Sequence, residues 1–186
     1  MQLEINNALI ILNQDGIILY PTDTVWGIGC DATNSDAVKK IYALKQREET
    51  KSMVCLVNNI DMLKTYIDAI PVAATNIIKK SQKPTTIIYN NPKGVAKNLV
   101  TNDNTLAIRV VNNVFCNELI KHLKKPLVST SANISGQPTP KSFAEISEQI
   151  LKGVDYIVNL PDEKSEAKPS AIIKLENDGS ATFIRK

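Results

Sequence analysis

The hydrophobic positions along this chain change repeatedly from helical spacing to short continuous runs. A first helix is predicted to begin near Leu3 and to close at Asp15-Gly16, because Leu3, Asn6, Ala8, Leu9 and Leu12 recur at helical intervals. The apolar run 17–20 that follows is predicted to be a buried strand, which ends at Pro21. The chain therefore opens with a helix that leads into a strand.

The same alternation continues along the rest of the sequence. Further helices are predicted from Asn34 or Ser35 to residues 45–47, and over 61–67, 71–80, 115–123 and 141–151. Further strands are predicted over 53–57, 85–89, 105–110, 127–129, 156–158, 171–175 and 181–184, the last two joined by the turn signal Asn177-Asp178-Gly179. This order predicts a single α/β domain over residues 1–186, with a twisted, mixed parallel and antiparallel open sheet flanked by helices.

Composition and charge narrow the function classes. Apolar residues make up 43% of the chain and charged residues 22%, as in ordinary globular proteins. The formal net charge of +3 permits an anionic ligand such as a nucleotide, but it is below the excess typical of dedicated nucleic-acid binders. Three separated cysteines and one histidine disfavour a zinc site and suit a reducing compartment. Because neither a secretion signal nor a membrane-spanning run is indicated, we expect a cytoplasmic protein without membrane contact.

Polar side chains follow the first predicted strand. Thr22, Asp23 and Thr24 place two hydroxyls and a carboxylate at a strand end, where α/β proteins often bind ligands. The alternative is a turn in which these side chains satisfy only nearby backbone groups. The segment 27–32 also fits the dinucleotide pattern G-x-G-x-x-A, but the expected strand–turn–helix context is missing. A Rossmann site is therefore not expected.

Cationic residues gather at the end of the second predicted helix. Lys45, Arg47 and Lys51 suit a solvated helix end, where the helix dipole favours positive charge. Alternatively, Lys45 and Arg47 converge on phosphate oxygens, which a planar guanidinium contacts in a bidentate manner. The sequence contains no P-loop pattern, so a nucleotide would bind outside that scheme.

A hydroxyl-rich segment, 129–136, follows the predicted strand 127–129. Its hydroxyls, the Asn133 amide and its small residues suit a polar ligand, but they suit a capped Asx or ST turn equally well. The chain lacks a G-x-S-x-G elbow, and His122 lies off the apolar stripe of its helix, where we expect it to be exposed. A site built from these residues is expected to act by positioning and charge.

Taken in order, these segments resemble the successive motifs of the YrdC-like threonylcarbamoyl-AMP synthase family, in its short, single-domain branch. The matching segments are 21–29, 45–47, 84–86, 107–110, 129–133, 169–172 and 183–185. The resemblance implies a YrdC-like fold and a nucleotidyltransferase that joins L-threonine, bicarbonate or CO2, and ATP into threonylcarbamoyl-AMP, with release of pyrophosphate. The product would pass to the tRNA threonylcarbamoyl transferase machinery.

The resemblance also implies roles for individual residues. Lys45 and Arg47 are expected to be catalytic and to contact the ATP phosphates, with Mg2+ carried by the nucleotide and no metal held by the protein. The other expected ATP-binding residues are Thr86, Ser131, Asn133 and Arg185. The expected threonine-binding residues are Thr24, Arg109, Ser129 and Ser170, with Arg109 pairing the carboxylate.

Some positions depart from the family pattern. Trp26 replaces the usual tyrosine, Glu48 replaces a common proline, and Ser81-Gln82-Lys83-Pro84 stands where Trp-Pro-Gly-Pro is usual, which changes the shape expected of the nucleotide site.

Two alternative functions remain: a non-catalytic YrdC-fold paralogue, or an RNA-binding protein that acts on tRNA or double-stranded RNA. The polar segment 161–169 is expected to be a mobile surface loop that could act as a lid.

Overall fold

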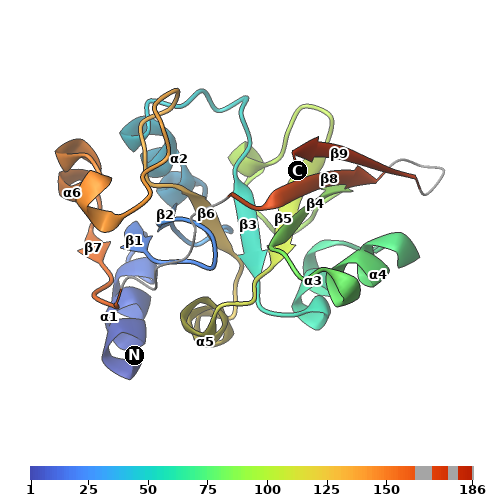
Figure 1. The fold of residues 1–186 in the computed structure, drawn as a ribbon, viewed down its shortest axis with the longest axis horizontal. Helices are drawn as coiled ribbons and strands as arrows, with labels where there is room; N and C mark the ends of the chain where they lie inside the picture. The colour runs from blue at the N-terminus through green and yellow to red at the C-terminus, as the bar shows by residue number, and fades with distance from the viewer. Residues whose placement is uncertain (162–168, 176–179, 186) are drawn as a thin grey trace.

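One continuous sheet lies at the centre of the molecule (Figure 1). The computed structural model describes residues 1–161, 169–175 and 180–185, and within these nine strands follow the order β7-β1-β2-β6-β3-β5-β4-β8-β9. The strands are β1 (Ile18–Tyr20), β2 (Gly27–Gly29), β3 (Val54–Val57), β4 (Thr85–Asn90), β5 (Thr105–Val110), β6 (Leu127–Ser131), β7 (Tyr156–Ile157), β8 (Ala171–Leu175) and β9 (Ala181–Arg185). The helices are α1 (Gln2–Leu12), α2 (Ser35–Leu44), α3 (Ile60–Tyr66), α4 (Val72–Lys80), α5 (Val114–Leu123) and α6 (Glu148–Gly153), with short 3-10 helices η1 (Lys97–Leu99) and η2 (Phe143–Glu145).

Strand pairing in the sheet is mixed. β1 pairs with β7, β3 with β5, and β4 with β8 in parallel. The other neighbouring strands are antiparallel, including the β8–β9 pair at one edge. The prediction of an α/β fold with a mixed open sheet is confirmed.

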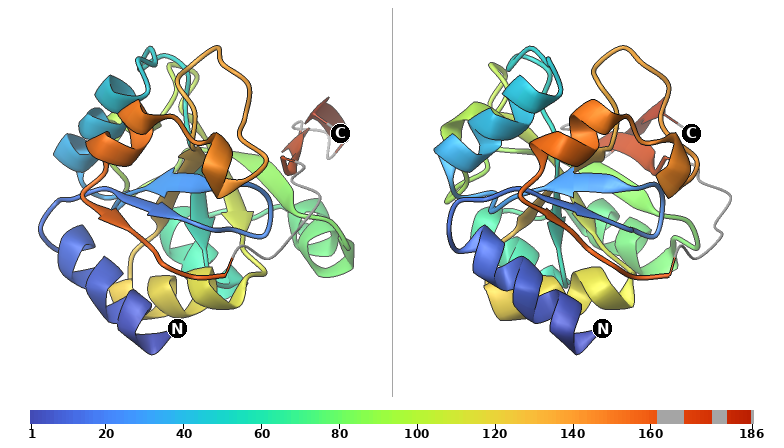
Figure 2. Two further views of the ribbon diagram at one scale, coloured as in Figure 1. Left: turned by 60° about the vertical axis from the view of Figure 1, so that its left-hand side comes forward. Right: turned by 90° about the vertical axis from the view of Figure 1, so that its left-hand side faces the viewer.

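Helices cover both faces of the sheet (Figure 2). α1 and α5 form one core with Ile18, Tyr20 and Leu56, whereas α2, α3, α4 and α6 join Leu19 and Ile28 in the core of the other face. Successive residues of β1 therefore enter opposite cores, because strand side chains alternate between faces. Burial on both faces explains why this strand is a continuous apolar run in the sequence.

The close approach of β1, β2 and β6 depends on Gly29. A Cβ atom there would lie 2.4 Å from the Val128 carbonyl oxygen and 2.8 Å from a ring carbon of Tyr20. The buried Tyr20 hydroxyl donates a hydrogen bond to that same carbonyl at 3.2 Å. This packing holds β1 and β2 against the start of β6.

Two predicted elements differ from the structure. The strand β2 was not expected, because its three residues, Gly-Ile-Gly, have little intrinsic strand preference. The single helix predicted over 141–151 is wrong: only η2 and α6 form, separated by Ile146 in an extended conformation. Phe143 packs against Trp26, with ring centroids 5.1 Å apart, and Ile146 is buried, so tertiary contacts override the helical pattern.

Several local predictions can be compared with the described residues. Asn34 caps α2 by accepting hydrogen bonds from the backbone of Asp36 and Ala37, as expected. Gly27 and Gly29 lie within a strand, which agrees with the rejection of a Rossmann turn, and His122 is exposed. The turn signal 177–179 and most of the segment 161–169 lie outside the described residues.

Two classes of feature are absent from the described part of the chain. No helix within residues 1–161, 169–175 and 180–185 is both long and apolar enough to cross a bilayer. The same residues contain no group of three or more histidine, cysteine, aspartate or glutamate side chains arranged to hold a metal ion.

Candidate active site

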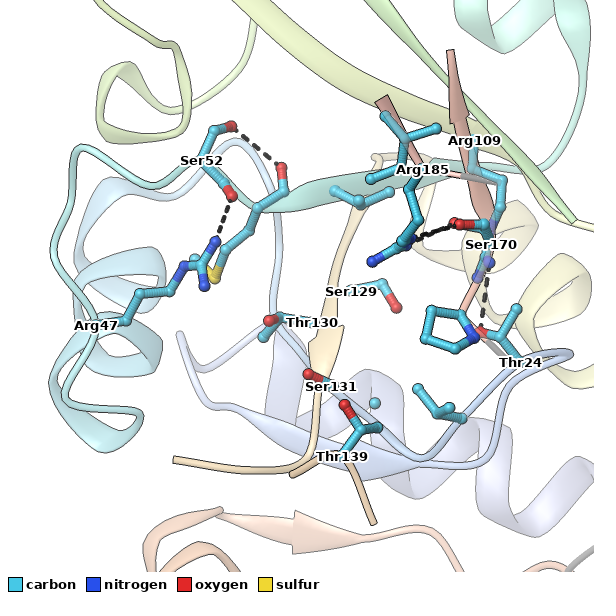
Figure 3. Close-up of a pocket in the computed structure, with 16 residues that line it drawn as sticks. Thr24, Arg47, Ser52, Arg109, Ser129, Thr130, Ser131, Thr139, Ser170 and Arg185 are labelled. Carbon is cyan, nitrogen blue, oxygen red and sulfur yellow. Dashed lines mark hydrogen bonds between the residues drawn. The ribbon is translucent and has the colours of Figure 1, made fainter. Parts of the chain in front are cut away.

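A cavity of about 230 Å³ opens where segments from distant parts of the chain meet (Figure 3). Its walls come from the segment after β1, the segment leading into β3, and strands β5, β6, β8 and β9. The described residues that line it are Thr24, Val25, Gly27, Arg47, Ser52, Met53, Val54, Arg109, Ser129, Thr130, Ser131, Thr139, Pro169, Ser170, Ile172 and Arg185. Hydroxyl and guanidinium groups therefore predominate among its polar groups.

Arg109 of β5 lies deep in the cavity wall. Only 4% of the residue is exposed, and its Nη2 lies 3.1 Å from Asp23 Oδ1. Its Nη1 donates to Thr24 Oγ1 at 3.4 Å (Figure 3). Arg109 therefore reaches the cavity as a buried cation held by the segment after β1.

The segment after β1 also has the turn structure given as the alternative. Thr22 Oγ1 accepts a hydrogen bond from the Thr24 backbone N–H at 3.0 Å and donates one to the Val25 carbonyl at 2.7 Å. These local bonds shape the turn, and Thr24 nevertheless lines the cavity. The two interpretations of this segment are thus compatible.

Arg185 of β9 reaches the cavity beside Ser170. Its Nε donates to the Ser170 carbonyl at 2.8 Å and its Nη2 to the Ser170 hydroxyl at 3.4 Å. That hydroxyl also shares a hydrogen bond of 2.8 Å with Thr86 Oγ1, which is fully buried. Burial lowers the pKa of Arg185, and the positive charge of Arg109 lowers it further. Thr86 is therefore linked to Arg185 through Ser170.

Arg47 lies on the opposite side of the cavity from Arg109 (Figure 3). Its Nε donates to the Lys51 carbonyl at 2.8 Å and its Nη2 to the Ser52 carbonyl at 2.9 Å. Burial lowers the pKa of this guanidinium. Arg47 thus fastens the segment leading into β3 while presenting a cation to the cavity.

Lys45 is buried beneath the segment after β6. The residue is 1% exposed, and its Nζ donates hydrogen bonds to the carbonyls of Ser131 and Asn133. Burial lowers the pKa of this amine to about 7, and the positive charge of Arg47 adds to the effect. Lys45 therefore contacts the backbone behind the cavity wall and is not among the lining residues.

The family comparison adds to this geometry. The Sua5_yciO_yrdC family model, which is described as telomere recombination, matches residues 10–186. The chain belongs to this family.

Known members of the Sua5/YciO/YrdC family are similar to the chain over most of its length. It is 37% identical over 157 residues to the threonylcarbamoyl-AMP synthase of Pseudoalteromonas translucida (strain TAC 125), which covers 83% of this chain and 84% of that protein. The crystal structure of E. coli YciO superimposes with a TM-score of 0.84 at 26% identity, covering all of this chain and 90% of that one.

P. abyssi Sua5, solved in complex with L-threonine, has a TM-score of 0.85 at 24% identity and shows a shared fold. The match covers 97% of the present chain but only 53% of the Sua5 chain. The chain thus spans about half the length of that structural neighbour.

The sequence predicted most of the polar residues that line the cavity. The predicted site residues that line it are Thr24, Arg47, Arg109, Ser129, Ser131, Ser170 and Arg185. Lys45, Thr86 and Asn133 are not among the lining residues; Lys45 and Thr86 are buried, and Asn133 is half-buried. The Asn133 amide donates to the carbonyls of Ile134 and Gln137, at 3.0 and 2.7 Å, and its Oδ1 has no hydrogen-bond partner among the described residues, so this side chain does not form the Asx turn considered from the sequence.

Some residues that line the cavity of this protein were not predicted as site residues. Thr130 was part of the hydroxyl-rich segment, and its position in β6 between Ser129 and Ser131 was the available signal. Ser52 directly precedes an apolar strand, and Thr139 follows a proline in an irregular segment. No motif marked either residue, because each reaches the cavity through tertiary packing.

The charge of the cavity defines what it can bind. Arg47, Arg109 and Arg185 all line it, and no carboxylate does so among the described residues. Hydroxyl groups supply further hydrogen-bond donors along β6. Such a site favours anions with several oxygen atoms, such as carboxylates and phosphates.

Proposed function

We propose that this protein is an L-threonylcarbamoyladenylate synthase that forms threonylcarbamoyl-AMP and pyrophosphate from L-threonine, bicarbonate or CO2, and ATP. The observation that carries the proposal is the convergence of Arg47, Arg109 and Arg185 on one hydroxyl-lined cavity. The reaction brings together a carboxylate and a triphosphate, and both need cationic partners. The similarity to a protein named threonylcarbamoyl-AMP synthase supports the same assignment.

The positions of the arginines suggest how the substrates divide the cavity. We place the threonine carboxylate on Arg109, with Thr24, Ser129 and Ser170 nearby, because Arg109 is the most deeply buried of the three arginines that line the cavity. Arg47 then faces the phosphates from the opposite wall, and Arg185 lies between the two regions (Figure 3). The cavity is smaller than the roughly 300–1,000 Å³ typical of ligand pockets, so we expect the adenosine to extend beyond it.

In this arrangement the reaction depends on alignment and charge. The neutral threonine amine adds to CO2 and releases a proton to solvent to give a carbamate, and a carbamate oxygen attacks the α-phosphorus in line. The bond to the β-phosphate oxygen breaks and pyrophosphate leaves. Guanidinium groups stabilise the negative charge of the phosphates during this displacement, which is the main means of catalysis in phosphoryl and nucleotidyl transfer.

Residues outside the cavity lining support this chemistry. We propose that Lys45 and Asn133 shape the segment that presents Ser131, and that Thr86 orients Ser170. Their direct contact with ATP, expected from the family resemblance, stays a prediction. The described lining offers Mg2+ no carboxylate, so we infer that the ion enters on the nucleotide phosphates. We further propose that the product serves tRNA threonylcarbamoylation in the cytoplasm.

Pyrophosphate release provides the test. Purified protein is mixed with ATP, L-threonine and bicarbonate, and each component is omitted in turn. The proposal requires release that depends on threonine and on bicarbonate. Pyrophosphate release without threonine would reject the synthase. RNA binding without pyrophosphate release would favour the RNA-binding alternative. Absence of both activities would favour the non-catalytic paralogue.

The variant Arg47→Ala tests the phosphate side of the cavity. We expect it to lower turnover by about 100-fold or more, because a charge-stabilising donor is lost, while its circular dichroism spectrum remains that of a folded protein. Lys51→Ala is the matched control, since it removes an exposed cation four residues away that pairs with Glu48. Equal activity in the two variants would contradict the role of Arg47.

A further inference from the structure

Asp23 lies against Arg109 but is not among the described residues that line the cavity. Its side chain is 13% exposed, and Arg109 is 4% exposed. The two side chains come from separate segments, the turn after β1 and the middle of β5. Asp23 therefore supports an expected substrate-binding residue from outside the space where substrate would lie.

The contact between these two residues leaves hydrogen-bonding capacity unused. Asp23 Oδ1 lies 3.1 Å from Arg109 Nη2, but the contact lacks the direction of a hydrogen bond, and within the described part of the chain Oδ1 has no hydrogen-bond partner. Arg109 Nε is likewise buried without a partner among the described residues. Buried polar atoms are usually satisfied, so the free Arg109 Nε donor is suited to an acceptor oxygen such as that of a substrate carboxylate.

Charge explains why a carboxylate is needed at this position. Burial of a guanidinium without a counter-charge costs free energy. The planar group could also take several orientations within a wall of hydroxyl groups. Asp23 attracts Nη2, and Thr24 accepts a hydrogen bond from Nη1 at 3.4 Å. Both terminal nitrogens are thereby held in place by protein groups.

We infer that Asp23 is a positioning residue that holds Arg109 in the orientation needed to bind the substrate carboxylate. The inference rests on the proposed function and deepens it. Asp23 would make the enzyme selective for amino acids with a free α-carboxylate, because only a carboxylate makes full use of the aligned Arg109 guanidinium. It would leave nucleotide binding unaffected, because Arg47 lies on the opposite wall.

The test compares Asp23→Asn with Asp31→Asn. Asp31 is another buried carboxylate, 4% exposed, which pairs with Lys125 and accepts hydrogen bonds from Thr33, away from the cavity. For Asp23→Asn we expect KM for L-threonine to rise about tenfold or more, with KM for ATP changed by less than about twofold. For Asp31→Asn we expect lower thermal stability with both KM values unchanged.

A carboxylate-specific measurement separates positioning from general damage. The wild-type protein should prefer L-threonine to L-threoninamide in kcat/KM, and Asp23→Asn should lose most of this preference. Asp23→Glu keeps the charge but moves it by one methylene, so it should fold and still show a raised KM for threonine. Both measurements report the orientation of Arg109. A purely structural role of Asp23 would not change KM for threonine or the preference for a free carboxylate selectively.

The possible outcomes distinguish the inference from the proposed function. Absence of threonine-dependent pyrophosphate release in the wild-type protein would overturn both. Wild-type release combined with an unchanged threonine KM in Asp23→Asn and Asp23→Glu would overturn only the positioning role. Unfolding of both variants, or an equal rise in KM for threonine and ATP, would also overturn it, because Asp23 would then be a general structural residue.

Discussion

Lys45 joins the end of α2 to the segment after β6. Its ammonium donates to the carbonyls of Ser131 and Asn133, and its own carbonyl accepts a hydrogen bond from the Ser135 backbone at 2.8 Å. The neighbouring residue, Gln46, has a positive φ of 50°, which turns the chain away from the helix. A single side chain thus fixes the backbone that presents the Ser131 hydroxyl.

The pKa of Lys45 predicts a pH-dependent contribution to stability. Burial lowers this pKa from 10.5 to about 7, so between these values the unfolded chain binds more protons than the folded chain. The stability contributed by Lys45 should therefore rise with pH across this window and be lost as pH falls toward 7. Urea unfolding of the wild-type protein and of Lys45→Met, from about pH 7 to about pH 10, measures the difference.

Comparison with the variant isolates the lysine. Tyrosine and cysteine side chains titrate in the same range, but they are common to both proteins and cancel in the difference. Lys45→Met also loses two hydrogen bonds, which lowers its stability by a constant amount. Parallel stability curves for the two proteins would show that the lysine titrates normally when folded.

Thr86 gives a second prediction at the level of single residues. Thr86→Val keeps the side-chain shape but removes the 2.8 Å hydrogen bond to Ser170. Ser170, which we place near the threonine carboxylate, is then held less firmly, so we expect KM for L-threonine to rise about threefold to tenfold. Thr101→Val is the control, because it removes the 2.7 Å contact with Thr105 away from the cavity lining. The same kinetic change in both variants would argue against a specific role for Thr86.

At the level of elements, the apolar pattern predicted those helices and strands whose burial is regular. Residues 18–20 enter the cores of both faces, so their continuous apolar run was informative. β2 forms because β1 and β6 pair with it on either side, and that cause lies outside its own three residues. The expected helix over 141–151 is interrupted by contacts of Phe143 and Ile146, which no local pattern reveals.

Gly29 allows a test of this packing. In Gly29→Ala the new methyl would lie 2.4 Å from the Val128 carbonyl oxygen, so the strands must separate, and we expect a loss of about 3 kcal/mol or more. Gly136→Ala is the comparison, because its Cβ would meet nothing within 4 Å, although its φ of +84° is strained. For that variant we expect a loss of about 1 to 2 kcal/mol, and urea unfolding measures both. A smaller effect at Gly29 than at Gly136 would contradict the packing argument.

At the level of the whole molecule, the site gathers positive charge that a ligand can neutralise. Burial lowers the pKa of Arg185, and the positive charge of nearby Arg109 lowers it further, because two like charges repel each other. The motifs of the sequence indicated which residues meet here. They did not separate the residues that line the cavity from those behind it, such as Lys45 and Thr86, because that depends on side-chain directions set by the assembled sheet.

This repulsion predicts stabilisation by anions. Pyrophosphate at about 100 times its Kd should raise the melting temperature by about 5 to 10 °C, from a binding contribution of about 2.7 kcal/mol. The shift should be smaller at high ionic strength, because salt screens the charges, and smaller in Arg47→Ala than in Lys51→Ala. A shift that is the same in both variants would place the pyrophosphate elsewhere.

The cavity also has a consequence for protein synthesis. Its walls include Thr24, near one end of the chain, and Ser170 and Arg185, near the other. On the ribosome, the earlier part of the site must wait until β8 has emerged and paired with β4, and β9 has paired with β8. Partly synthesised chains that lack β8 and β9 therefore cannot assemble the complete binding site, so ligand binding reports that both strands have been made and have joined the sheet.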